Sequence, residues 1–97
     1  MKFTFHPGAQ QDIFDASDHY ETQANLIVAA RFLEELNRVV LFLAEFPGLG
    51  TPMSKTKKIF PLKTFPYSII YRDLGDRIRI LVVKHQHRRP GYGGSRQ

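Results

Sequence analysis

Two strands joined by a turn can be read in residues 67–84, YSIIYRDLGDRIRILVVK. Here the apolar residues follow the period of two that is typical of strands, most clearly in RIRI. Gly75, in the central DLGD, gives the turn a residue that adopts positive φ without strain. We therefore predict a β-hairpin with strands at 67–72 and 77–84. The apolar run at 81–83 indicates that the second strand is central in its sheet and buried on both faces.

Two helical periodicities precede this hairpin. Residues 9–23 place four apolar side chains on one face, which are Ala9, Ile13, Ala16 and Tyr20. We expect the acidic residues of this helix to face solvent. A second helix runs from the candidate N-cap Asn25 to about residue 46. Its apolar residues keep a period of 3.6 residues, and they are Val28, Phe32, Leu36, Val39, Val40 and Leu43. The short link predicts an antiparallel helical hairpin.

The remaining segments complete the predicted order. Apolar and polar residues alternate over 2–6, which predicts a first strand. The composition of residues 49–58 predicts a basic loop. Residues 59–64 predict a strand less strongly, because Pro61 has no backbone N–H to donate to a neighbouring strand. The order β-α-α-β-β-β predicts an α+β fold, in which the helical hairpin lies on one face of a small, mainly antiparallel sheet. We expect a single domain over 1–97, an open outer sheet face and a mobile basic tail at 88–97.

Composition and charge narrow the function classes. The 97 residues suffice for one domain, and the absence of cysteine excludes disulfides and thiolate metal sites. No apolar run reaches the roughly 18 residues of a membrane span, so we expect a cytosolic protein with no membrane partner. The net charge is +5, but residues 1–50 carry −4 and residues 51–97 carry +9. This asymmetry predicts that the C-terminal half faces a polyanion, either nucleic acid or an acidic protein segment.

Six motifs in fixed order carry a family likeness. They are HPGA at 6–9, Tyr20, RFL at 31–33, FPG at 46–48, FPYSIIY at 65–71 and VKHQHRRPGY at 83–92. Together they resemble the RelE/ParE superfamily of toxins from type II toxin–antitoxin modules. The likeness covers nearly the whole chain.

The resemblance implies a toxin neutralised by a small antitoxin, whose acidic, partly disordered segment becomes ordered on the toxin. Operator DNA would be reached only through the antitoxin. RelE-like members cut mRNA in the ribosomal A site without a metal, whereas ParE-like members poison DNA gyrase and depend on their C-terminal region.

The chain departs from the nuclease branch. RelE-like nucleases place several Lys or Arg on the strand before the Tyr-containing stretch and one just after its first Tyr. Here those positions hold Ile59, Pro61 and Ser68, and only Lys63 is left as a candidate. This difference favours the ParE-like branch, a binding poison rather than an enzyme. A RelE-like nuclease and a degenerate toxin retained as a binding module are the alternatives.

The candidate catalytic residues, if the chain is a nuclease, are His85, Arg88, Tyr92 and Lys63. Imidazole titrates near neutral pH, guanidinium holds phosphate, and tyrosine stacks on bases, which together suffice for metal-free RNA cleavage. The alternative is that the histidines end a strand with local hydrogen bonds and the arginines bind an acidic partner. A His-x-His metal site lacks further ligands, so we expect no metal or other cofactor.

A second set of residues is predicted to bind the target or the antitoxin. Arg77 and Arg79 alternate with Ile78 and Ile80 and therefore share a sheet face, which Arg72 of the neighbouring strand joins. Guanidiniums on one face repel one another unless carboxylates or phosphates of a partner cover them, and the alternative is a face that only water covers. The full set is Arg72, Arg77, Arg79, Lys84, His87 and Arg89.

Overall fold

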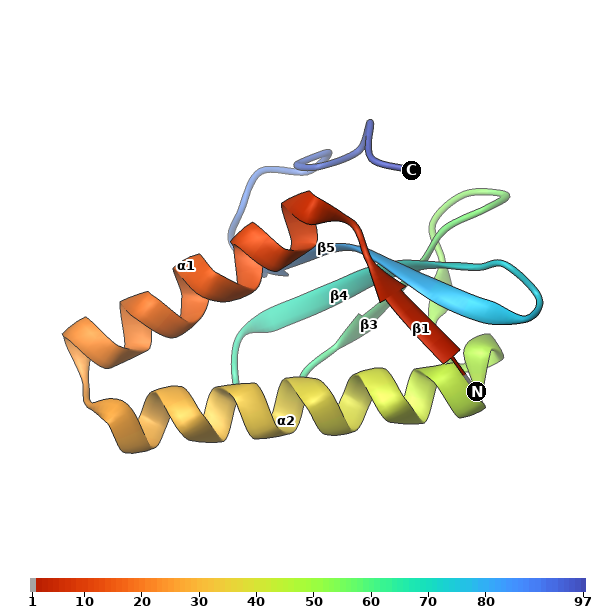
Figure 1. Cartoon of the computed structure of the whole chain (residues 1–97). Coiled ribbons are helices and arrows are strands. Elements are labelled where there is room, and N and C mark those ends of the chain that lie inside the picture. The colour runs from red at the N-terminus through yellow and green to blue at the C-terminus, as the bar shows by residue number, and fades with distance from the viewer. Residues whose placement is uncertain (1) are drawn as a thin grey trace.

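The computed structural model describes residues 2–97, in which two helices pack against a mixed five-stranded sheet (Figure 1). The elements are β1 (Lys2–Phe5), α1 (Pro7–Gln23), α2 (Leu26–Glu45), the 3₁₀ turn η1 (Pro47–Leu49), β2 (Thr51–Pro52), β3 (Lys58–Pro61), β4 (Tyr67–Asp73) and β5 (Arg77–His85). The strand order is β1-β5-β4-β3-β2, with only β1 and β5 parallel among these strands. The predicted α+β fold is confirmed. None of the helices in residues 2–97 is long and apolar enough to cross a membrane.

Local hydrogen bonds explain where the helices begin. The Asn25 side chain accepts a hydrogen bond from the Val28 amide at 3.0 Å and caps α2, as predicted. The His6 imidazole accepts one from the Gly8 amide at 2.9 Å, and Pro7 occupies the first turn of α1, where its missing N–H costs nothing. The apolar side of the helical hairpin then covers one face of the sheet.

The core lies between α2 and the inner face of the sheet. Apolar side chains from both layers are at most 4% exposed, and they include Phe32, Leu36, Leu43, Ile69, Ile78 and Ile80. β5 lies between β1 and β4, and its run Ile80, Leu81 and Val82 is buried on both faces of the sheet. The predicted central position of this strand is confirmed.

The predicted strand at 59–64 is partly wrong. β3 ends at Pro61, because the next residues turn toward α2, where the Glu35 carboxylate accepts hydrogen bonds from the Lys63 and Thr64 amides at 2.9 and 3.0 Å. The two-residue strand β2 pairs with the outer edge of β3. It lies inside the predicted basic loop, and two residues are too few to show a period-two pattern.

The free edge of β5 is completed by α1 and the tail, rather than by a longer β1. β1 pairs only with the first part of β5, and beyond Ile80 the Val83 amide donates to the Asp12 carboxylate at 3.0 Å. The Leu81 carbonyl accepts from the Arg96 guanidinium at 3.0 Å. Asp12 is therefore buried, at 6% exposure, and the expectation that the acids of α1 all face solvent is wrong.

Candidate functional site

Three guanidiniums gather on the face of the sheet that is opposite α2. We call Arg72, Arg77 and Arg79 the basic face. The strand register places Arg72 directly opposite Arg79, and Arg77 lies two residues before Arg79 on the same side of β5. The buried Ile78 and Ile80 point the other way, into the core. The shared face that the sequence predicted is present.

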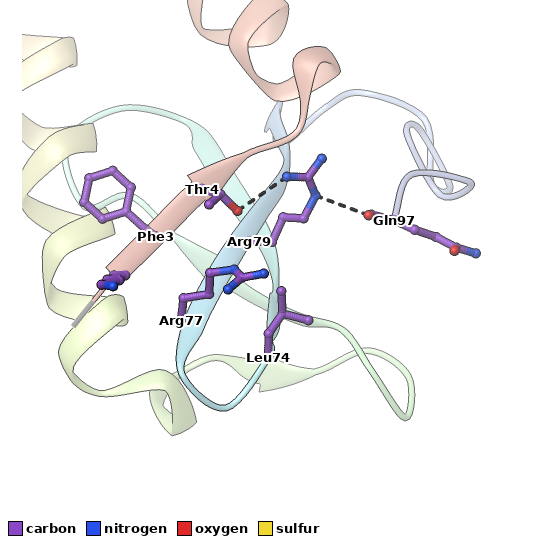
Figure 2. A pocket seen from close by; sticks show the side chains of 7 residues that line it. Phe3, Thr4, Leu74, Arg77, Arg79 and Gln97 are labelled. Atoms are coloured by element: carbon purple, nitrogen blue, oxygen red, sulfur yellow. Dashed lines mark hydrogen bonds between the residues drawn. The ribbon is translucent and has the colours of Figure 1, made fainter.

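A hollow of about 810 Å³ opens beside β1 and β5, where Arg77 and Arg79 line it (Figure 2). Figure 2 shows the Arg79 guanidinium between Thr4 and Gln97, to which it donates hydrogen bonds of 3.4 and 3.2 Å. Arg77 pairs with the adjacent Asp76 at 3.0 Å, and the two side chains are 43% and 69% exposed. Because an exposed ion pair contributes at most about 1 kcal/mol, Arg77 can exchange this carboxylate for that of a partner.

Arg72 has a different environment. It lines a second hollow of about 350 Å³ together with Lys57 and Gln97. Its Nε atom is buried and has no hydrogen-bond acceptor among the residues described.

The tail, residues 88–97, crosses the outer side of the sheet. The sequence predicted an open outer face, but the Tyr92 ring packs against an apolar cluster of Ile70, Leu81 and Val82. The Lys57 ammonium donates to the Gly94 carbonyl at 2.6 Å. The tail therefore covers part of the outer face, and the predicted open face is present only in part.

Asp12 is the anchor of the tail. Its carboxylate accepts hydrogen bonds of 2.6 Å from the Tyr92 hydroxyl and 2.6 Å from the Arg96 guanidinium. The hydrogen bond to Asp12 raises the pKa of Arg96 above its ordinary value, although burial opposes that shift. The Arg88 guanidinium lies 4.3 Å from the centre of the Tyr92 ring, in a cation–π contact. Asp12 thus orients Tyr92, and through it Arg88.

A polar cleft of about 200 Å³ separates α1 from the ends of β4 and β5. Its lining is mainly charged or aromatic: Asp12, Asp15, Ala16, His19, Tyr67, Val83, Lys84, His85 and Arg88. The His85 and Tyr67 rings meet edge to face at 5.2 Å. Burial raises the pKa of the Tyr67 hydroxyl, which the positive charge of Arg88 partly offsets. Tyr67 is therefore a hydrogen-bond donor at neutral pH.

The predicted catalytic residues are only partly brought together. His85 and Arg88 share the polar cleft, and Tyr92 contacts Arg88. Lys63 lies in the loop between β3 and β4 and does not line the cleft. His19 and Tyr67 do line it, and neither could be predicted from the sequence, because each lies in a pattern that predicts only a helix or a strand.

The other predicted binding residues are dispersed. Lys84 lines the polar cleft, whereas His87 and Arg89 are exposed where the tail begins. The His87 amide donates to the His85 imidazole at 3.1 Å, which is the local hydrogen bonding expected if these histidines only end a strand. In the stretch 2–97, no three His, Asp or Glu residues lie close enough together to hold a metal ion.

Comparison with known proteins gives a family match and structural matches. Residues 3–90 match the model of the family described as the ParE toxin of type II toxin–antitoxin system, parDE. A solved chain from the "Chromosomal ParDE TA system from P. aeruginosa" is similar in structure, with a TM-score of 0.76 and 22% sequence identity over 88% of this chain and 95% of that chain. At that identity the likeness concerns the fold alone. No curated protein sequence matches.

Proposed function

Because the chain belongs to the family of ParE toxins of type II toxin–antitoxin systems, we propose that it inhibits DNA gyrase and that a cognate acidic antitoxin neutralises it. The family match over residues 3–90 is the observation that carries this proposal. The toxin acts by binding, with no chemical step of its own, and it is free to act once the antitoxin is removed.

The basic face supports the part of the proposal that concerns the antitoxin. Arg77 and Arg79 line an open hollow, and Asp76 is the one carboxylate that pairs with either of them among residues 2–97. Charge-assisted hydrogen bonds between guanidinium and carboxylate are about twice as strong as neutral ones. An acidic antitoxin segment that lies along this face would relieve the mutual repulsion of the arginines, and its binding would weaken at high salt.

The arrangement of the candidate catalytic residues favours a binding poison over a nuclease. Metal-free RNA cleavage needs a base, an acid and cations around one phosphate. Lys63 is outside the polar cleft, and the Tyr92 hydroxyl already donates to Asp12 at 2.6 Å. Lys63 and Tyr92 are therefore not placed around one phosphate with His85 and Arg88, as a nuclease site would need.

A ribosome-dependent mRNA nuclease is the second candidate, and one observation favours it. The polar cleft holds the imidazole of His85 beside the guanidinium of Arg88, with His19 and Tyr67 in the same lining. These groups include an imidazole, which is the commonest general base, and a guanidinium, which can bind phosphate.

Expression in bacteria separates these candidates. We expect growth to stop on induction, total mRNA to stay intact, and co-expression of the small protein encoded beside the toxin to restore growth. His85→Ala and Tyr92→Phe should retain growth inhibition, apart from any loss of stability measured on the purified variants. Ribosome-dependent mRNA cleavage that His85→Ala abolishes would establish the nuclease instead. Absence of growth inhibition with a folded protein would favour the degenerate binding module.

A further inference from the structure

The C-terminal half of α2 carries an apolar groove that no other described element fills. The floor of the groove is formed by Val39 of α2 and Phe60 of β3, and its volume is about 470 Å³. Leu41 and Phe42 stand at its rim and are 49% and 47% exposed. Large apolar side chains that are exposed together mark an interaction surface more often than singly scattered ones do.

Two opposite charges flank this apolar centre. Arg38 and Glu45 both line the groove, seven residues apart and so on the same side of the helix. Two turns of helix separate them by roughly 10 Å, which is too far for an ion pair within the chain. Among residues 2–97 the ion pairs are Asp76–Arg77 and Asp12–Arg96, so neither Arg38 nor Glu45 forms an ion pair, although Arg38 lies near the Glu35 carboxylate.

Along α2 four of the groove residues follow the order Arg38, Leu41, Phe42 and Glu45, and this order is self-complementary. The midpoint between Arg38 and Glu45 falls between Leu41 and Phe42, so a two-fold axis there brings a second α2 alongside the first in the antiparallel sense. Arg38 of each protomer then faces Glu45 of the other, and the two apolar pairs meet at the axis. In a two-fold interface each contact occurs twice in this manner.

We propose that the α2 groove binds a second copy of this chain, forming an antiparallel homodimer centred on Leu41 and Phe42. The apolar surface extends beyond the groove to Phe46, which is 49% exposed and whose ring centre lies 5.3 Å from that of Phe42. α2 covers the inner side of the sheet, and the basic face is on its outer side. The dimer therefore leaves Arg77 and Arg79 accessible to another partner, and its formation is independent of the proposed function.

Charge reversal tests this pairing sharply, because the two reversed variants should complement each other. Sedimentation of the wild-type protein across about 1 to 200 µM should show a monomer–dimer equilibrium with a dissociation constant in the micromolar range, as expected for a small interface. Arg38→Glu and Glu45→Arg should each raise that constant at least 10-fold, because like charges then meet twice. An equimolar mixture of the two variants should form a heterodimer with near wild-type affinity, since both facing pairs are again opposite. Glu21→Arg, an exposed reversal on α1, is the control and should dimerise normally.

Three results would each overturn the proposal. The first is a wild-type protein that stays monomeric up to 200 µM. The second is an unchanged dissociation constant for folded single reversals, which would place any dimer on another surface. The third is a mixture that associates no better than either variant alone, as a groove that fits a different protein partner would give. Matching circular dichroism spectra and a cooperative melting transition establish that each variant is folded, even where Arg38→Glu lowers the melting temperature through its proximity to Glu35.

Discussion

The Asp12 carboxylate and the Arg96 guanidinium lie 2.6 Å apart, although 84 positions separate them in the chain. Their side chains are only 4% and 17% exposed. The same carboxylate accepts from the Val83 amide, and the same guanidinium donates to the Leu81 carbonyl. One ion pair therefore closes the part of the β5 edge that β1 does not reach, and it fixes the tail to the sheet.

Asp12→Ala should destabilise the protein by about 3–5 kcal/mol, because it leaves a partly buried guanidinium and a buried amide without their acceptor. Urea unfolding followed by circular dichroism measures this loss. The tail should also become cleavable by trypsin at its arginines. Asp15→Ala, one turn further along α1 and exposed, should change stability by less than about 0.5 kcal/mol. Equal effects of the two substitutions would contradict the anchoring role of Asp12.

Gly50→Ala should destabilise the protein by about 1–3 kcal/mol, as overpacking in a filled core does. A Cβ at Gly50 would come within 2.5 Å of the hydroxyl of the buried Tyr71. That hydroxyl accepts from the Gly50 amide at 2.9 Å and donates to the Pro47 carbonyl at 2.7 Å, so it cannot move away without losing both bonds.

The matched control for this substitution is Gly48→Ala, because a Cβ at Gly48 meets nothing within 4 Å. Its midpoint of thermal unfolding should stay within a few degrees of the wild-type value. If Gly50→Ala melts at the same temperature as Gly48→Ala, the close contact with Tyr71 is not a constraint.

Glu35→Gln should cost about 1–2 kcal/mol at pH 7, because the carboxylate accepts charge-assisted hydrogen bonds that an amide makes less well. Burial alone would raise the pKa of Glu35, but hydrogen bonds from Thr64 and Lys63, together with the nearby Arg38, hold it below its ordinary value. A lowered pKa means that the stabilisation is fully present above the unfolded pKa and is lost as the pH falls through the folded one.

The pH dependence supplies the check on Glu35. The difference in unfolding free energy between wild type and Glu35→Gln should be constant from pH 7 to about 5 and should shrink below about pH 4. If the difference in unfolding free energy grew as the pH fell, the pKa of Glu35 would have to be raised in the folded protein, and this explanation would be refuted.

Combined Arg77→Glu and Arg79→Glu substitutions should weaken antitoxin binding by about 100-fold or more at low salt, because guanidinium–carboxylate pairs become like-charge contacts. Isothermal titration calorimetry with the protein encoded beside the toxin measures the effect. Lys55→Glu, in the exposed β2–β3 loop, should change affinity less than about 3-fold. Equal affinities for the double variant and the wild type would remove the basic face from the antitoxin interface.

Much of the fold follows from local patterns. The period of α2 and the cap at Asn25 give that helix its bounds, and the hairpin turn has Gly75 at φ 92° as its sequence predicts. β2 escaped prediction because two residues carry no periodicity. β3 ends early because the Glu35 carboxylate, which is distant in sequence, accepts hydrogen bonds from the amides of Lys63 and Thr64.

The site was less predictable than the fold. Alternation in RIRI was enough to place Arg77 and Arg79 on one face. The role of Asp12 was not visible, since an acid in an amphipathic helix ordinarily faces solvent, and only the meeting of α1, β5 and the tail makes its burial favourable. His19 enters the polar cleft for the same reason, because α1 crosses the ends of β4 and β5.

Supercoiling of relaxed plasmid by purified DNA gyrase, titrated with the purified toxin, tests the central claim most directly. We predict that the toxin inhibits supercoiling in a concentration-dependent manner, and that prior addition of the cognate antitoxin abolishes the inhibition. Full supercoiling activity in the presence of excess folded toxin would contradict the account, and mRNA cleavage by the same preparation on ribosomes would replace it with the nuclease.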